Sequence, residues 1–284
     1  MLYFLDRKTK NGYNKIEVEC ILEVETMLQI KNYIKVSSID EAYELNQKKS
    51  NVIIGGMHWL KMSTASVGTA IDLSGLGLDQ IVETDDAFEI GCMVSLRQIE
   101  THEGLNTYSS GAVKDAVKDI VGVQFRNTAT VGGSIFGRYG FSDVLTVFMA
   151  MDTYVVCHKA GEVPICEYAK QKADRDILVK LVVKKKPIQV KYLAQRHAKT
   201  DFPMLTCAVS NMEGKWTAVL GARPMKAMEV AIPEDVMKGT AKEVGEYVAG
   251  QVTFGSNMRG SAEYRKDVAA VLVKRGLLAV GKEQ

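Results

Sequence analysis

Two Gly-Gly pairs, Gly55-Gly56 and Gly132-Gly133, are the residues of this chain whose spacing suggests ligand chemistry. Each pair is expected where a strand ends, and such a turn leaves several backbone N–H groups bare. Glycine lets an anion approach these groups where a Cβ would collide with it. Two loops of this kind could hold the two phosphates of one dinucleotide. Gly-Gly is also a common tight-turn dipeptide, and that alternative stays open.

Neither pair belongs to a familiar phosphate-binding signature. The chain has no G-x-x-x-x-G-K-[ST] loop, and no G-x-G-x-x-G follows a predicted strand. Thr130 and Ser134 flank the second pair, and their hydroxyls could add donors to those of the backbone. The hydroxyls strengthen the ligand interpretation without removing the turn interpretation.

The composition is that of a soluble globular protein without a strong attraction for polyanions. The 284 residues include 36 basic and 34 acidic side chains, which give a net charge of +2, and 46% of the residues are hydrophobic. A nucleic-acid-binding domain usually concentrates its basic residues on one face. The one basic cluster, Lys184 to Lys186, is expected to be a solvated turn. No apolar run approaches the roughly 20 residues of a membrane span, so we expect neither a nucleic-acid partner nor a membrane span.

The cysteines indicate reduced thiols and no metal site. Their number is odd, they are widely scattered, and no C-x-x-C pair occurs, so neither zinc nor an iron–sulfur cluster is expected within this chain. The N-terminus becomes polar after five residues, too early for a signal sequence. We therefore expect a cytoplasmic protein. The cysteines are Cys20, Cys92, Cys157, Cys166 and Cys207.

Helices and strands are mixed without a regular βαβ repeat, which predicts an α+β fold of two or three subdomains beginning near Met27. Two capping boxes, Ser38 with Glu41 and Ser95 with Gln98, mark helix starts. The strand at 189–196 is expected to pair with the strand at 176–186. Helices are predicted over 39–47, 96–104, 110–122, 144–151 and 261–280, further strands over 51–56, 88–94 and 153–158, and a hairpin over 203–223.

Four motifs in a fixed order make the sequence resemble the FAD-binding subunits of the molybdenum hydroxylases. This family includes the flavoproteins of xanthine dehydrogenase and carbon monoxide dehydrogenase. NVIIGGMHWLK resembles the first flavin loop, and ATVGGSIFGRYGFSDVLTVFMAMD is similar to the second. KYLAQRHAKTDFPMLTCAVS resembles a strand segment of the family, and SAEYRKDVAAVLVKRGL its C-terminal helix. The match extends from about Met27 to the end of the chain.

The resemblance implies a fold and a domain organisation. The expected architecture is α+β: a PCMH-type (vanillyl-alcohol-oxidase-like) FAD-binding fold of two subdomains, followed by a C-terminal α+β subdomain with an antiparallel sheet. The FAD-binding domain would cover residues 27–185 and the C-terminal domain residues 186–284. Residues 1–26 would form an N-terminal extension to which the resemblance assigns no role.

The resemblance also implies which residues hold a noncovalent FAD. Gly132 and Gly133 would let backbone amides meet its diphosphate, Thr130 and Ser134 would add hydroxyl donors, and the first loop would cover it from the other side. Asp143 would contact the adenosine part, or serve as a helix N-cap, and both roles could hold together. A further match is Leu178, whose backbone would lie near the flavin or adenine unless it is a core leucine. The first loop consists of Ile53, Ile54, Gly55, Gly56, Met57, His58, Trp59 and Leu60.

Three positions depart from the family pattern. His58 replaces a serine or threonine, and either donates to phosphate or is merely exposed. Trp59 either packs against the protein or stacks on the flavin. Leu193 replaces a common lysine, and Lys191, which lies two positions earlier on the same strand face, could substitute for it.

The function implied is electron transfer by a flavin subunit. Iron–sulfur clusters in a small subunit would collect electrons from a molybdenum-binding large subunit, and this chain would pass them to NAD or another acceptor. The flavin carries the redox chemistry, so no catalytic side chain and no metal ligand is expected here. The alternatives are a partner subunit that has lost its flavin and a stand-alone FAD-dependent oxidase. The loop FGRYGF, with Phe136, Tyr139 and Phe141, is expected on the docking rim for the iron–sulfur subunit, or folded inward.

Overall fold

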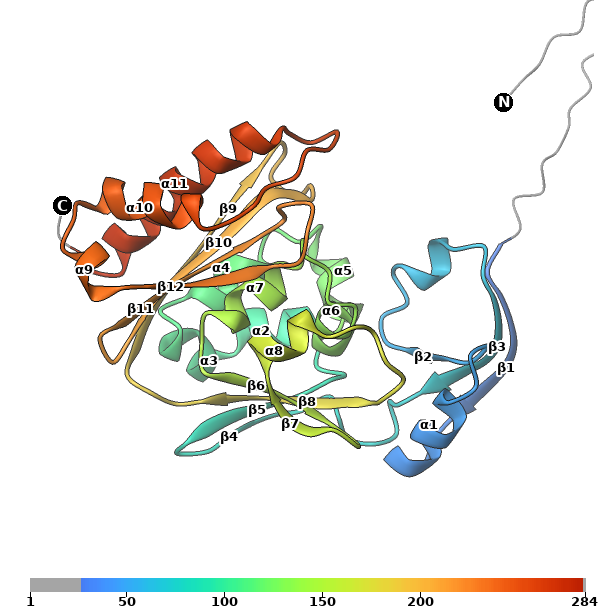
Figure 1. Cartoon of the computed structure of the whole chain (residues 1–284). Helices are drawn as coiled ribbons and strands as arrows, with labels where there is room; N and C mark the ends of the chain where they lie inside the picture. Colours follow the sequence, from blue (N-terminus) through green and yellow to red (C-terminus); the bar gives the residue numbers. More distant parts are fainter. Residues whose placement is uncertain (1–26, 283–284) are drawn as a thin grey trace, which may run out of the picture.

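Three β-sheets, each with its own helices, follow one another along the chain (Figure 1). The structure is a computed structural model that describes residues 27–282. The expected extension, residues 1–26, lies outside the described residues. None of the described helices is long and apolar enough to cross a membrane.

The first sheet is small and parallel, with strand order β1-β3-β2. Helix α1 begins after Ser38, whose side chain accepts a hydrogen bond from the Glu41 amide. In Figure 1 this unit stands at one side of the molecule, and the loop after β2 reaches toward α6. The elements are β1 (Gln29–Lys35), α1 (Ile39–Asn46), β2 (Val52–Ile54), the 3-10 helix η1 (Leu60–Met62) and β3 (Ser66–Asp72).

The second sheet is antiparallel, with strand order β4-β5-β8-β6-β7, and the helices of the middle segment lie above it in Figure 1. Its strands are β4 (Ile81–Glu83), β5 (Ala87–Gly91), β6 (Thr153–Cys157), β7 (Gly161–Pro164) and β8 (Leu178–Lys184). Its helices are α2 (Leu96–Thr101), α3 (Glu103–Tyr108), α4 (Ala112–Val117), α5 (Val123–Thr128), α6 (Val131–Phe136), α7 (Asp143–Met149) and α8 (Ile165–Lys170).

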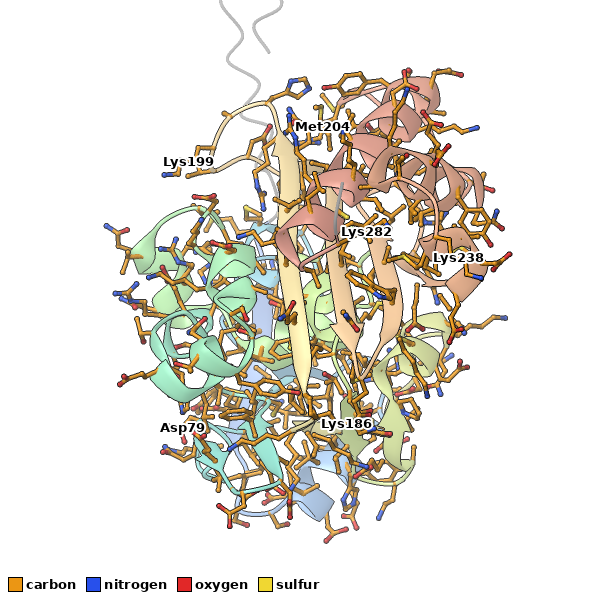
Figure 2. All side chains as sticks on the ribbon, turned by 90° about the vertical axis from the view of Figure 1, so that its left-hand side faces the viewer. Asp79, Lys186, Lys199, Met204, Lys238 and Lys282 are labelled. Atoms are coloured by element: carbon orange, nitrogen blue, oxygen red, sulfur yellow. The ribbon has the colours of Figure 1, made fainter. Side chains whose placement is uncertain are left out.

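The third sheet is antiparallel, with strand order β12-β11-β10-β9, and it separates two layers of helices. Helices α10 and α11 cover one face, whereas α4 and α7 of the middle segment pack against the other. Figure 2 shows the strands running between Lys186 at one end and Met204 at the other. The elements are β9 (Ile188–Arg196), β10 (Pro203–Met212), β11 (Lys215–Gly221), β12 (Met228–Ile232), α9 (Glu234–Met237), α10 (Ala241–Gly250) and α11 (Ala262–Ala279).

Two hydrophobic cores result from this layering. The larger core fills the space between the five-stranded sheet and the inner face of β9 and β10, and it includes Tyr192 and Ala208. The smaller core lies between the outer face of the third sheet and α10 and α11, and it includes Val209 and Leu272. Alternate residues of one strand therefore serve different cores, as the period of two in a strand requires.

The expected α+β fold is confirmed, and several local predictions hold. Ser95 and Gln98 form a complete capping box, and Ser261 caps the C-terminal helix. The box at Ser38 is only half formed, because the Glu41 carboxylate accepts from the Ser37 amide. The hairpin over 203–223 is present as β10 and β11.

Two local predictions are wrong. Strand β8 does not pair with β9, because it lies between β5 and β6 in the second sheet, whereas β9 pairs with β10 in the third. Between them the chain leaves one sheet for the other through the Lys185–Pro187 turn. The helix expected over 110–122 ends at Val117, and the chain turns sharply at Val121, whose φ is 49°.

Candidate functional site

The two glycine loops, far apart in the sequence, pack directly against each other. A Cβ on Gly55 would lie 2.7 Å from the Thr130 hydroxyl oxygen, and one on Gly56 would lie 2.2 Å from the Thr128 carbonyl oxygen. Real Cβ atoms do not approach other atoms so closely, so the first pair must be glycine for the loops to meet. Both loops therefore belong to one site.

The first loop presents a run of unpaired backbone amides. Among residues 27–282, the N–H groups of residues 55–60 donate to no acceptor, although the carbonyl of Met57 accepts from Lys61. Met57 has a left-handed φ of 59°, which curls the chain before η1 begins. Successive N–H groups around a left-handed residue form a concave anion-binding nest. We call residues 55–60 the amide nest.

The second loop differs, because its amides are already paired. The Gly132 amide donates to the Cys92 carbonyl at 2.8 Å, and the Gly133 amide donates to the Thr130 hydroxyl at 3.1 Å. In this structure both amides are therefore bonded within the protein and are not free for a diphosphate. The cause is that α6 begins here with Thr130 as its N-cap, so the Gly133 amide is satisfied by the cap and the Gly132 amide by a carbonyl in the turn after β5.

The second loop instead presents the exposed Gly133 and a Thr130 hydroxyl whose proton is not used. Gly133 is exposed, and a Cβ placed on it would meet only the Thr130 hydroxyl, at 3.0 Å. Gly132 is buried, and its Cβ would lie 2.6 Å from the Cys92 carbonyl oxygen. Thr130 accepts from Gly133, which leaves its own proton for another acceptor. The Ser134 hydroxyl donates to the Thr130 carbonyl and is occupied.

His58 anchors the amide nest to α5. Its ring stacks on Phe125 with centroids 3.8 Å apart, and its Nε2 lies 2.8 Å from the Thr128 hydroxyl. Burial, assisted by Lys61, lowers the pKa of His58, so the ring is neutral at physiological pH. His58 is thus a support for the loop, which neither of its two expected roles described.

Replacing His58 with alanine should loosen the nest. The lost hydrogen bond and the lost stacking are each worth about 1 kcal/mol, so we expect FAD binding to be weaker by up to about thirtyfold in a flavin titration. His58→Gln, which can still bond Thr128 but cannot stack, should lie between. Because folding lowers the pKa, the stabilisation by His58 is present above pH ~6.5 and is lost as the pH falls through the folded-state value. An alanine variant that binds FAD like the wild type would contradict this role.

Trp59 points away from the core and joins a cluster on the surface. Its side chain is 52% exposed, and its ring centroid lies 5.8 Å from that of Phe202 and 6.1 Å from that of Phe141. Tyr139 stacks on Phe141 at 5.2 Å. We call Trp59, Tyr139, Phe141 and Phe202 the aromatic cluster. The loop FGRYGF thus presents two of its three aromatic rings to this surface.

Asp143 lies in a buried ion pair. It is buried, and its Oδ1 accepts hydrogen bonds from the hydroxyl of Tyr192 and the guanidinium of Arg196, both on β9. Burial raises the pKa of Asp143 to about 6 although both partners oppose the shift, so the carboxylate is ionised at neutral pH. The helix N-cap is Ser142, which accepts from the Leu145 amide. Asp143 therefore ties α7 to the C-terminal sheet, and the N-cap role expected of it belongs to Ser142.

The remaining predicted residues are structural in this conformation. The Leu178 side chain is 5% exposed and belongs to the larger core, as its alternative interpretation held. Lys191 pairs with Asp115 at 2.7 Å, and Leu193 packs against the C-terminal core, so Lys191 does not take the place of a flavin-facing lysine. In the first loop, Ile53 packs against the larger core, while Ile54 and Leu60 are half-buried.

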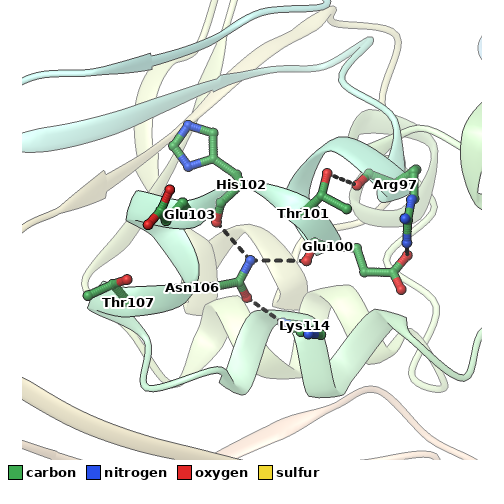
Figure 3. A pocket seen from close by; sticks show the side chains of 8 residues that line it. All are labelled: Arg97, Glu100, Thr101, His102, Glu103, Asn106, Thr107 and Lys114. Carbon is green, nitrogen blue, oxygen red and sulfur yellow. Dashed lines mark hydrogen bonds and ion pairs between the residues drawn. The ribbon is translucent and has the colours of Figure 1, made fainter.

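A hollow of about 630 Å³ lies on α2 to α4 and shares no lining residue with the amide nest (Figure 3). One of its polar side chains, Asn106, is fully bonded within the protein. The Asn106 side chain donates to the carbonyls of Ile99, Glu100 and His102 and accepts from the Lys114 amide.

The cysteines and acidic residues of the described chain provide no further chemistry. Cys92, Cys157, Cys166 and Cys207 are unpaired, and burial raises the pKa of the Cys92, Cys157 and Cys207 thiols to about 12. Over residues 27–282, no group of three or more His, Cys, Asp or Glu side chains could hold a metal ion.

The sequence signature of the FAD binding domain in molybdopterin dehydrogenase matches residues 26–185, more than half of the chain. The chain belongs to this FAD-binding family. The signature of the CO dehydrogenase flavoprotein C-terminal domain matches residues 192–280. The family assignment makes this chain an FAD-binding, medium-type subunit of the molybdenum hydroxylases, and the PCMH-type fold is confirmed with it.

Related proteins agree with the family assignment along almost the whole chain. The nicotine 6-hydroxylase medium subunit of Paenarthrobacter nicotinovorans is 24% identical over 274 residues, which are 88% of this chain and 96% of the relative. In fold, the chain resembles quinoline 2-oxidoreductase of Pseudomonas putida 86, with a TM-score of 0.77 at 17% identity. It also resembles carbon monoxide dehydrogenase of Hydrogenophaga pseudoflava, with a TM-score of 0.75 at 20% identity. The match covers 88% of this chain and 96% of the matched chain in both structures.

Proposed function

We propose that this chain is the electron-transfer subunit of a molybdenum-containing hydroxylase or dehydrogenase, and that its noncovalent FAD passes electrons from iron–sulfur clusters to NAD or another acceptor. The observation that carries the proposal is the amide nest opposite exposed Gly133. Unpaired amides at a glycine-lined loop suit the diphosphate of a dinucleotide. The loop geometry therefore fits FAD, with most of the hydrogen-bond donors for the diphosphate on the first loop.

The residues of the chain bind and position the cofactor. The amides of residues 55–60 would hold the diphosphate, the Thr130 hydroxyl would add one donor, and Gly133 would give the ligand room. FAD supplies the redox chemistry when bound. The Asp143 contact with β9 holds the C-terminal sheet in place behind the site.

The partners proposed are a molybdenum-binding large subunit and an iron–sulfur small subunit. Relatives named medium subunit and medium chain support this organisation. The domain boundaries we propose are 27–185 and 186–284, because β8 of the second sheet ends at Lys184 and β9 of the third sheet begins at Ile188. The aromatic residues Tyr139 and Phe141 remain our candidates for part of a docking rim.

Anaerobic reduction tests the proposed function. The purified chain loaded with FAD should accept electrons from dithionite or NADH, as seen by bleaching of the flavin absorbance, and should hydroxylate nothing by itself. Purification of the native complex should bring two further subunits with it. A complete oxidase cycle by this chain alone, or its isolation from its natural source as a free monomer, would contradict the proposal.

A further inference from the structure

The loop between α8 and β8 contacts three separate parts of the molecule through three consecutive side chains. It reaches toward the first sheet (Figure 1). Asp174 bonds to the segment after α6, Arg175 to the segment between α1 and β2, and Asp176 to the turn between β6 and β7. We call these three residues the tether.

Arg175 holds the segment that leads into the first glycine loop. Its guanidinium donates to the backbone carbonyls of Asn46, Lys48 and Asn51, and the last two of these bonds measure 2.8 Å each. The Asn46 side chain returns a hydrogen bond of 2.8 Å to the Arg175 carbonyl. Asn51 directly precedes β2, and β2 leads directly into Gly55. Arg175 therefore fixes the start of the strand that carries the amide nest.

The type of side chain matters at this position. The acceptors of the Arg175 guanidinium are neutral oxygens of residues 46–51, and it forms no ion pair within residues 27–282. A guanidinium has five donors in a rigid fork, whereas a lysine has one nitrogen on a flexible stem. An arginine can therefore hold three carbonyls of one turn together, and a lysine cannot.

Asp174 is linked in the same way to the second glycine loop. Its carboxylate accepts a hydrogen bond of 3.0 Å from Arg138, whose guanidinium also donates to the carbonyls of Tyr168 and Phe136. Arg138 is buried, and it has a left-handed φ of 49° just after α6. Since Gly133 lies in the first turn of α6, Asp174 is joined through Arg138 to the opposite end of that helix.

Asp176 anchors the tether to the second sheet. Its carboxylate accepts hydrogen bonds from the amides of Lys159 and Ala160, at 3.1 and 2.9 Å. Strand β8 of that sheet begins two residues later, at Leu178. The side chains of Asp174 and Arg175 thus extend from a fixed point of the fold.

Strand pairing does not set the spacing of the two glycine loops. Among residues 27–282, no strand of the first sheet pairs with a strand of the second. The loops meet through the close approach of Gly55 and Gly56 to Thr130 and Thr128. A ligand held by both loops needs them at one spacing, and its apparent affinity falls with the fraction of molecules that have this arrangement.

We propose that the tether positions the cofactor site: Arg175, acting through β2, and Asp174, acting through Arg138 and α6, hold the two glycine loops at the spacing that receives the FAD diphosphate. The inference rests on the proposed function. Each residue holds its element at the end opposite to the glycine loop, so both are positioning residues. The tether arranges the free protein for binding and adds no contact to the ligand.

The test measures how fast the full chain, freed of its FAD, takes up added FAD, followed by flavin fluorescence. Arg175→Ala should slow association about tenfold and leave the dissociation rate nearly unchanged, because the free protein has the competent spacing less often whereas bound FAD itself holds the loops together. Arg175→Lys should lie between, because it can keep one of the three carbonyl bonds. Asp174→Ala removes a half-exposed carboxylate and should slow association about threefold.

The matched control is Asn106→Ala. The Asn106 side chain also donates to three carbonyls, but it lies in the hollow on α2 to α4. Its loss should lower the midpoint of thermal unfolding, as Arg175→Ala does, and should change neither rate. A variant that only weakens the fold is thereby distinguished from one that misplaces the loops.

The outcomes separate the inference from the function on which it rests. If Arg175→Ala takes up FAD as fast as the wild type, or Asn106→Ala slows uptake equally, the inference is overturned and the proposed function stands. An effect confined to dissociation would mean that Arg175 contacts the ligand, which also overturns it. If Arg175→Ala does not fold, wild-type association rates in both Arg175→Lys and Asp174→Ala overturn it. A folded wild-type chain that takes up no FAD would overturn the inference and the proposed function together.

Discussion

Gly133→Val should strip FAD from the protein while leaving its fold intact. Gly133 is exposed, and a Cβ there meets only the Thr130 hydroxyl, at 3.0 Å, which a small adjustment can accommodate. The rest of the valine side chain would project into the space where the diphosphate faces the amide nest. We expect at least a hundredfold loss of FAD affinity, measured by titration of the apoprotein, with the midpoint of thermal unfolding lowered by only a few degrees.

The neighbouring glycine supplies the matched control. A Cβ on Gly132 would lie 2.6 Å from the backbone oxygen of Cys92, so Gly132→Val should disturb the sheet and lower the stability of the whole domain. The two variants should thus separate ligand contact from folding. Full flavin occupancy in Gly133→Val would mean that the second pair serves only as a turn.

Arg196→Leu should cost the protein much of its stability. The substitution leaves the Asp143 carboxylate buried, with Tyr192 as its remaining partner. Breaking a buried ion pair from one side costs about 3–5 kcal/mol, which we expect as a fall of roughly 10 °C in the midpoint of thermal unfolding. The physical reason is the desolvation of an ion whose counter-charge has been removed.

The double variant Asp143→Leu with Arg196→Leu is the control for this pair. Removing both charges should restore much of the lost stability, because an apolar pair leaves no uncompensated ion. If Arg196→Leu is as stable as the wild type, the contact between α7 and β9 does not hold the C-terminal sheet. If the double variant is no better than the single one, lost packing rather than the buried charge causes the effect.

The glycine pairs could be recognised from the sequence because a close approach of two backbone segments usually requires glycine. The sequence could not show which glycine of the second pair faces a ligand, because residues far away in the chain determine what surrounds each Cβ position. Gly132 faces the Cys92 carbonyl in the turn after β5, and Gly133 is exposed, with only the Thr130 hydroxyl near its Cβ position. The hydrogen bond from the Gly132 amide to the same carbonyl could not be predicted either, because the two residues are far apart in the sequence.

Asp143 shows the same limit for a charged side chain. An aspartate at a helix start is typical of a cap or a ligand contact, and both were expected. Its partners Tyr192 and Arg196 lie 49 and 53 residues further along the chain, and only the packing of β9 on α7 brings them together. The wrong prediction that β8 pairs with β9 has the same origin, because the sequence of a strand does not determine in which sheet the strand pairs.

The role of His58 could be interpreted only from the folded structure. A histidine in a loop has no fixed role until its stacking partner, Phe125, is known. Helix caps, by contrast, were predictable, because their hydrogen bonds are local.

The central claim is that the two loops hold a dinucleotide through its diphosphate, and the identity of the bound flavin tests it most directly. The purified chain should be yellow, and heat should release a flavin whose fluorescence rises after cleavage by phosphodiesterase, which identifies FAD, at one molecule per chain. Release of FMN, or a folded and colourless protein that does not bind added FAD, would contradict the account.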